Sequence, residues 1–151
     1  MKDCGECSLC CKLLDVPGLA EPGQWCPHCQ PGKGGCLIHD DRPEICLGFD
    51  CFWRAESWPD WLRPDRSKVI FEALPGVKTI LISVETSTPN AWKDGKIIEV
   101  IMKLQSKGRP LVLKTIYNTA FFVPKGWTQK GVMDEIKKVI DWKNDCALVH
   151  N

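Results

Sequence analysis

The sequence lacks any apolar run of the roughly 18 to 20 residues that a membrane-spanning helix needs. Its first residues, MKDCG, have no hydrophobic segment after the lysine, so we expect no secretory signal. With 44% hydrophobic residues and 20 Lys and Arg against 19 Asp and Glu, the 151 residues are also not those of a disordered chain. These absences predict a cytoplasmic globular protein with no membrane partner.

The chain also lacks the short motifs of common enzyme classes and any run of basic residues. It has no GxxxxGK[ST] phosphate loop, no GxSxG and no HExxH. Residues 1–51 carry four basic and eight acidic residues, a net charge of −4, whereas residues 52–151 carry sixteen and eleven, a net charge of +5. Phosphate contacts require Lys and Arg, so we expect no nucleic-acid partner. A zinc-ribbon-like nucleic-acid module is therefore the least favoured hypothesis.

Cysteine, in contrast, is abundant, and nine of the ten cysteines lie within residues 4–51. A reducing compartment keeps thiols from pairing, so a dense cluster there is typical of metal binding. A disulfide framework is the alternative; it would require an oxidising compartment and would leave one of the nine cysteines unpaired. Cys146 stands apart, and we expect it to be a small buried apolar side chain.

The spacing of the cysteines gives the candidate ligands. In CGECSLCC, Cys7 follows Cys4 and Cys10 follows Cys7 by three positions, which lets two thiolates in a tight turn face one ion. Side chains of adjacent residues tend to diverge, so we expect the pair Cys10 and Cys11 to serve two ions, or one ion and a hydrogen bond to one of its ligands. The candidate metal ligands are Cys4, Cys7, Cys10, Cys11, Cys26, Cys29, Cys36, Cys46 and Cys51, with His28 and His39 as weaker candidates. They suffice for about two tetrahedral sites. Zinc is favoured; iron or an iron–sulfur cluster remains open, because spacing does not separate them.

The segment WCPHC at Trp25–Cys29 permits another interpretation, because it looks like the redox motif of thioredoxin-fold oxidases. In that fold the second cysteine lies in the first turns of a helix. Here QPGKGG follows, a run of helix breakers. We therefore interpret Cys26 and Cys29 as a metal-binding turn, or as one ligand beside one cysteine that binds no metal.

Two strings, CGECSLCC and GGCLIHDDRPEICLGFDCFW, together resemble the CxxCxxCC or YkgJ-like family of cysteine-cluster proteins, which chelate zinc or iron. The resemblance covers about the first 53 residues and is highly specific. It implies chelation by the matching positions Cys4, Cys7, Cys10, Cys11, Cys36, Cys46 and Cys51, and it brings no defined reaction.

The sequence departs from that family in the close pair Cys26 and Cys29 and in His39, where an aromatic residue is common. Arg42 and Pro43 match the family's RP element. We expect Pro43 to fix the turn that presents Cys46 and Arg42 to hold the site's shape by hydrogen bonds. Binding of an anionic substrate by Arg42 is the less favoured role.

The rest of the chain predicts an α+β fold. Residues 68–72 and 79–85 are predicted strands around a Pro75-Gly76 turn, and residues 111–117 and 119–123 a second hairpin around Asn118. Apolar residues at helical spacing predict helices over residues 95–107 and 128–142, with a tail that adds one more strand at most. The ββαββα order predicts a mainly antiparallel four-stranded sheet with both helices on one face.

Three parts follow from these patterns. Residues 1–52 form a cysteine-rich module with little regular structure that cannot fold alone, and bound metal is the simplest candidate to organise it. Residues 53–66, rich in Trp and Pro, form a joint, and residues 67–151 the α+β domain; we expect one compact unit.

Two functional hypotheses result. The favoured one is a metal-binding protein whose function is chelation, with a protein or small molecule as its unknown partner; the sequence leaves open whether it is an enzyme and favours that it is not. The alternative is an iron or iron–sulfur dependent redox or modification enzyme whose α+β domain binds the substrate; the sequence offers no catalytic residue for it.

Overall fold

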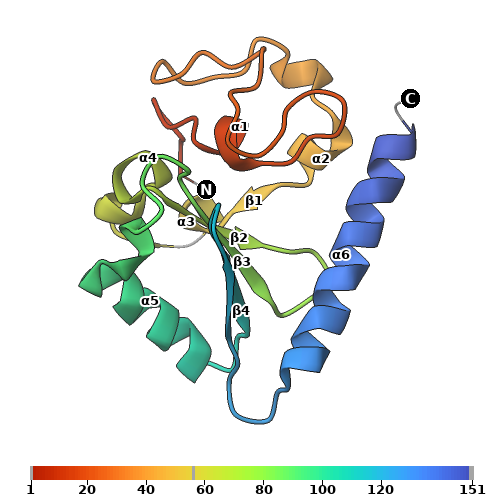
Figure 1. Cartoon of the computed structure of the whole chain (residues 1–151). Coiled ribbons are helices and arrows are strands. Elements are labelled where there is room, and N and C mark those ends of the chain that lie inside the picture. Colours follow the sequence, from red (N-terminus) through yellow and green to blue (C-terminus); the bar gives the residue numbers. More distant parts are fainter. Residues whose placement is uncertain (1, 56, 150–151) are drawn as a thin grey trace.

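The computed structural model describes the backbone of residues 2–55 and 57–149, and the side chains of these residues apart from Asp50 and residues 140–149. A five-stranded sheet in the order β1-β2-β3-β4-β5 lies at its centre (Figure 1). The strands are β1 (Asp50–Cys51), β2 (Val69–Ala73), β3 (Ile80–Val84), β4 (Leu111–Lys114) and β5 (Thr119–Phe122). All neighbouring strands pair antiparallel except β3 and β4, which are parallel. The α+β class and the mainly antiparallel sheet are therefore confirmed.

The sheet has one strand more than the four predicted. The extra strand, β1, belongs to the end of the cysteine-rich module and pairs with β2, with Asp50 opposite Ala73 and Cys51 opposite Glu72. A strand of two residues has no periodicity that a sequence pattern can detect. The structure therefore contains elements that the predicted ββαββα order did not include: strand β1 and the short helices that precede β2.

Helix α5 (Gly95–Ser106) connects the two parallel strands, as a crossover between parallel strands must. Asp94 caps its first turn by accepting a hydrogen bond from Lys96 N at 2.9 Å. Its apolar stripe is buried against the sheet residues of the main core and consists of Ile97, Val100, Ile101 and Leu104. The helix predicted over residues 95–107 is confirmed to within one residue.

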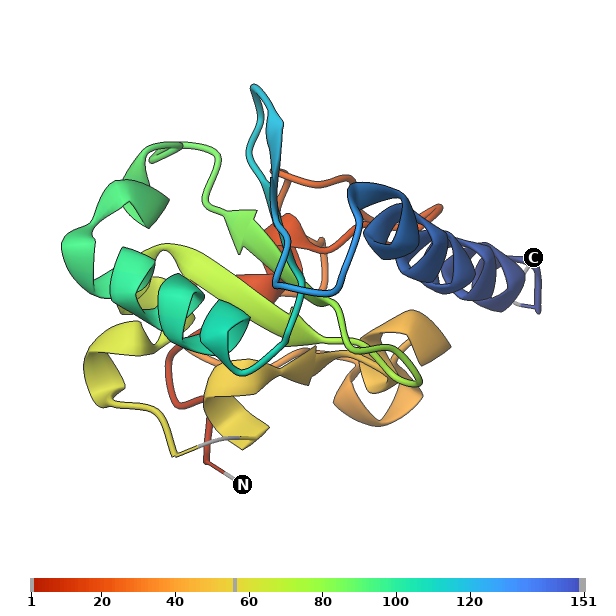
Figure 2. The same ribbon diagram turned by 90° about the horizontal axis from the view of Figure 1, so that it is seen from below.

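Helix α6 (Gln129–Val149) corrects two predictions. It lies on the opposite side of the sheet from α5, so the two helices do not share one face (Figures 1 and 2). Apolar periodicity shows that a helix has a buried face, but not which side of a sheet receives it. The helix also continues to Val149, because no Gly or Pro interrupts residues 143–149, and so the tail adds no strand. Within the described residues, no helix is both long and apolar enough to cross a membrane.

Apart from β1, the helices and strands described before β2 are all short helical turns. They are α1 (Cys10–Leu13), η1 (His39–Asp41), α2 (Glu44–Leu47), α3 (Phe52–Ala55), η2 (Asp60–Leu62) and α4 (Pro64–Ser67), and a seventh, η3 (Ala91–Lys93), precedes α5. Trp53 is 6% exposed and donates from Nε1 to the carbonyl oxygen of Pro59 at 3.1 Å. Trp58 and Trp61 pack against the main core. The tryptophans of residues 53–66 therefore contribute to the core of the sheet.

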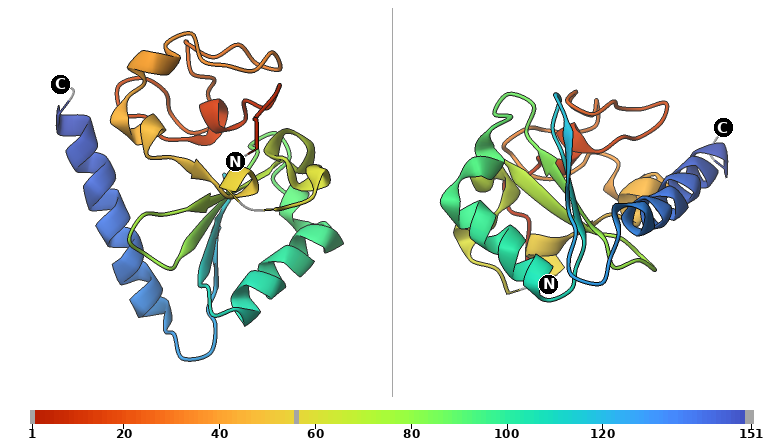
Figure 3. Two further views of the ribbon diagram at one scale, coloured as in Figure 1. Left: turned by 180° about the vertical axis from the view of Figure 1, so that it is seen from behind. Right: turned by 60° about the horizontal axis from the view of Figure 1, so that its bottom comes forward.

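The cysteine-rich module lies over one end of the sheet, beside the C-terminal part of α6 (Figure 3), and its helix α2 contacts α6. Leu9 and Leu13 of the module form a small second core with Ile70 of β2. Because Val69 and Phe71 belong to the main core on the α5 side, β2 is buried on both faces. This second core sets the position of α1, and with it that of Cys10 and Cys11.

A half-buried ion pair also ties the module to the end of β3. Lys12 Nζ lies 2.8 Å from Glu85 Oε1, and the two side chains are 15% and 8% exposed. The same carboxylate oxygen accepts hydrogen bonds from Thr86 Oγ1 and Ser87 N. Burial by itself would raise the pKa of Glu85, but these hydrogen bonds and the charge of Lys12 outweigh it and hold the pKa below its ordinary value.

We expect Glu85→Gln to lower the free energy of unfolding by about 1 to 3 kcal/mol at neutral pH, because it leaves Lys12 without its partner. A carboxyl whose pKa is lower in the folded state contributes stability above its unfolded pKa, about 4.5, and loses that contribution as the pH falls toward the folded value. The difference between wild type and variant should therefore shrink on acidification. Urea unfolding at several pH values measures it; a difference independent of pH would contradict the assignment.

Candidate metal centre

The cysteines of the module gather around one cavity of about 300 Å³ between the module and the sheet. Its lining includes Cys4, Cys7, Cys10, Cys11, Cys26, Cys36, Cys46 and Cys51. Cys29 is not part of the lining, but its thiol is hydrogen-bonded to that of Cys11. All nine are free thiols. The structure thus brings together three stretches of sequence that are up to 47 positions apart.

The first stretch is a tight turn followed by α1. Cys7 N donates to Cys4 O at 3.0 Å, and Gly5, between them, has φ +56°, a conformation that glycine adopts without strain. Gly5 N donates to Asp3 Oδ1 at 2.9 Å. The turn and the buried Leu9 and Leu13 leave Cys4, Cys7, Cys10 and Cys11 in the lining of the cavity.

The second stretch is a loop that folds back on the first. Cys29 N donates to Cys26 O at 3.0 Å, and Cys29 pairs with Cys36 in an isolated antiparallel bridge. Cys26 N donates to Cys11 O at 2.8 Å, which fixes the loop against α1. Cys29 begins no helix, so this segment has the turn predicted for it and not the geometry of a thioredoxin-type motif.

The third stretch provides Cys46 from α2 and Cys51 from β1. Pro43 precedes α2 and accepts a hydrogen bond from Cys46 N at 2.9 Å, in agreement with its predicted role. Arg42 Nε donates to His39 O at 2.7 Å and so holds the turn of η1.

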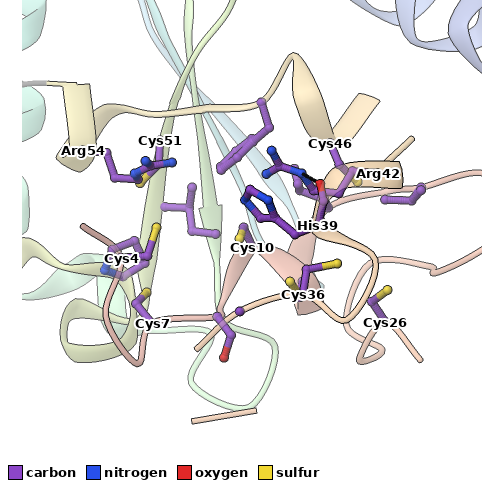
Figure 4. Close-up of a pocket in the computed structure, with 18 of the residues that line it drawn as sticks. Cys4, Cys7, Cys10, Cys26, Cys36, His39, Arg42, Cys46, Cys51 and Arg54 are labelled. Atoms are coloured by element: carbon purple, nitrogen blue, oxygen red, sulfur yellow. Dashed lines mark hydrogen bonds between the residues drawn. The ribbon is translucent and has the colours of Figure 1, made fainter. Parts of the chain in front are cut away.

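The thiols form two groups at opposite ends of the cavity (Figure 4). The Cys51 group comprises Cys4, Cys7 and Cys51, which lie on one side of the drawn pocket. The Cys46 group comprises Cys26, Cys36 and Cys46 on the other side, with Cys11, whose backbone oxygen accepts from Cys26 N, and Cys29, which pairs with Cys36 in the isolated bridge. Cys10 lies between the two groups in Figure 4 and is hydrogen-bonded to Cys11.

The environment favours the neutral thiols. Burial is the largest cause that raises the pKa values of Cys4, Cys7 and Cys51 in one group, and it raises those of Cys29 and Cys46 in the other to about 12 and about 11. For Cys11 the largest cause is the hydrogen bond with Cys10. These six thiols therefore favour the protonated form at neutral pH, and any metal that binds them must displace their protons.

As they stand, the side chains do not form a finished coordination shell. Among the side chains that the structure describes, no three or more of His, Cys, Asp or Glu lie close enough together to hold a metal ion. The number and the softness of the donors fit zinc, iron or another thiophilic ion, but binding requires side-chain rotation.

The two predicted histidines differ in position. His39 lines the cavity, with its side chain 63% exposed and Nδ1 3.3 Å from Asp40 Oδ1, whereas His28 is not in the lining. The side chain of Cys146 lies outside the described residues.

Sequence reasoning missed Arg54, which lines the cavity beside Cys51 and Cys4. Its guanidinium lowers the pKa of Cys4, against the larger effect of burial. The signal available in the sequence was its position three residues after Cys51, which places it on the same short segment as a candidate ligand.

Comparisons with protein-family models, with curated proteins and with solved structures found no match for this chain. The resemblance to the CxxCxxCC cysteine-cluster family therefore stays a prediction carried by the two strings quoted above.

Proposed function

We propose that this protein binds about two thiophilic metal ions per chain, zinc in preference to iron, through the cysteines of the module. The observation that supports this function best is the convergence of eight cysteines from three separate stretches on one cavity, with the ninth hydrogen-bonded to Cys11. A hydrophobic core does not require nine thiols at one place, whereas soft metal ions are bound by clusters of thiolates.

The two thiol groups suggest how the ions are divided. One ion would be held by the Cys51 group with Cys10, a set of four thiolates. The other would be held by Cys11, Cys26, Cys36 and Cys46, the members of the Cys46 group that line the cavity. Each such site carries a net charge of −2, and the guanidinium groups of Arg42 and Arg54 in the same lining offset part of it. When bound, the ions supply cross-links that organise a module with few helices and strands of its own.

The free thiols also support a reducing compartment, and we propose the cytoplasm as the location. We propose no reaction. The acidic residues of η1 and α2, which are Asp40, Asp41 and Glu44, are exposed and do not line the cavity, so none of them is placed to act as a general base there.

Elemental analysis of protein purified without oxygen tests the proposal, together with its visible absorption spectrum. We expect about two zinc ions per chain and no colour, since zinc has a filled d shell. Iron with visible charge-transfer bands, and above all acid-labile sulfide, would instead favour the redox alternative. Protein free of metal after such a purification, with no uptake on adding zinc, would contradict both.

A further inference from the structure

The cavity has a second kind of surface that metal binding does not use. Beside the thiols, its lining contains the aliphatic side chains of Leu14, Val16, Leu19 and Ile38. A volume of about 300 Å³ is also at the lower end of the range for small-molecule sites. An apolar wall contributes nothing to the coordination of an ion, but it is what the body of an organic ligand contacts.

Two arginines of the same lining have unused hydrogen-bond donors. Arg42 and Arg54 each donate from Nε to a backbone carbonyl oxygen, of His39 at 2.7 Å and of Lys2 at 3.1 Å. Lys2 N in turn donates to Arg54 O at 3.1 Å, so the position of Arg54 is fixed from both sides. Among the described residues, neither guanidinium has a carboxylate within 4.0 Å, nor a hydrogen bond from its terminal Nη groups.

The arginines outside the cavity are of two kinds. Arg63 makes a bidentate pair with Asp65, with two N–O distances of 2.7 Å, and Arg66 lies 4.0 Å from Asp60. Arg109, in contrast, donates from Nε to the backbone carbonyl oxygen of Lys78 at 2.6 Å, as the two cavity arginines do to their own carbonyl partners. The feature that sets Arg42 and Arg54 apart is therefore their place in the cavity lining, beside the apolar side chains named above.

Both guanidinium groups point toward the middle of the cavity from opposite sides (Figure 4). A guanidinium fork binds a carboxylate through two parallel hydrogen bonds, and a partly buried site strengthens them. The aliphatic residues named above would contact the hydrocarbon part of the same molecule.

We propose that the cysteine cavity binds a small organic monocarboxylate, whose carboxylate is held by Arg42 and Arg54 and whose short apolar body lies against Leu14, Val16, Leu19 and Ile38. This ligand site goes beyond metal binding, because it uses side chains that are not metal ligands.

Titration of the chain as purified, with its metal content measured on the same sample, tests the site. The probes are benzoate, its neutral isostere benzamide, and inorganic phosphate, followed by calorimetry and by amide chemical shifts of residues 2–55. We expect benzoate to bind at least tenfold more tightly than either control. Arg54→Gln and Arg42→Gln should each weaken benzoate binding by about 10- to 100-fold, whereas Arg66→Gln, outside the cavity, should leave it unchanged.

No binding of benzoate to the wild-type chain would overturn the site, whatever the metal content, and so would equal binding of benzamide or phosphate. A chain that keeps its metal ions but ignores benzoate would refute this inference while leaving the metal-binding proposal intact. A chain that takes up no metal but binds benzoate in an arginine-dependent way would support this inference and refute the metal-binding proposal. The wild-type comparison of benzoate with benzamide decides the question even if an arginine variant does not fold.

Discussion

Replacing Cys46 by serine is expected to lower the metal content from about two ions per chain to about one. Cys46 lies in α2 among the thiols of Cys11, Cys26 and Cys36, which act on its pKa, so its loss removes a central member of one ligand group. A serine hydroxyl is a much poorer ligand for a soft ion than a thiolate. Metal content per chain by elemental analysis measures the effect. Cys10→Ser is expected to act in the same direction, because Cys10 lies between the two groups (Figure 4).

The same substitution should destabilise the chain. An ion that binds only the folded state stabilises it by about 4 kcal/mol when its free concentration is 1,000 times its dissociation constant. The thermal unfolding midpoint of Cys46→Ser should therefore fall toward that of the metal-free wild type. Cys146→Ser, at a cysteine remote in sequence from the cluster, is the control and should keep the full metal content. Full metal content in Cys46→Ser and Cys10→Ser would refute the assignment of the cluster as the metal site.

The second large effect is expected at Gly34. A Cβ atom there would lie 2.1 Å from Gly5 O, a distance that no contact allows, and the residue has φ +70°. This close approach holds the loop before Cys36 against the Cys4–Cys7 turn, so Gly34→Ala must separate the two loops or strain them. We expect a loss of about 1 to 2 kcal/mol from the left-handed backbone and about 1 to 3 kcal/mol more from the overlap.

Gly32→Ala is the matched control. Gly32 has nearly the same conformation, φ +73°, but no atom within 4 Å of its Cβ position. It should show only the backbone part of the effect and keep the metal content, whereas Gly34→Ala should weaken metal binding as well. Chemical unfolding of both variants, with zinc affinity measured by competition with a chelator, separates the two contributions. Equal losses in the two variants would show that the contact with Gly5 does not matter.

Several elements were predictable from local patterns because local forces decide them. Helix α5 has a capping aspartate, an uninterrupted apolar stripe and a glycine and a proline at its end, and its predicted range was nearly correct. The β2–β3 hairpin follows from two β-rich runs around Pro75-Gly76. The turns at Cys4–Cys7 and Cys26–Cys29 likewise follow from spacing and glycine.

Other features depend on contacts between segments distant in sequence, to which local patterns are blind. The ion pair of Lys12 with Glu85 spans 73 positions, and nothing near either residue indicates its partner. Helix α6 lies on the face of the sheet away from α5, where it contacts α2 of the module, a segment more than 80 positions earlier in the chain. Strand β1 forms only because β2 offers it an edge.

The amino-acid sequence by itself thus determined that this protein has an α+β part and a separate cluster of nine thiols, because periodicity, turn residues and cysteine spacing are local properties. Only the tertiary structure decided that the thiols line one cavity in two groups, that Arg54 joins Arg42 there, and that apolar side chains form part of its wall. The reason is that Leu9 and Leu13 must be buried against Ile70, and this hydrophobic contact, invisible along the chain, brings the three cysteine stretches and both arginines together.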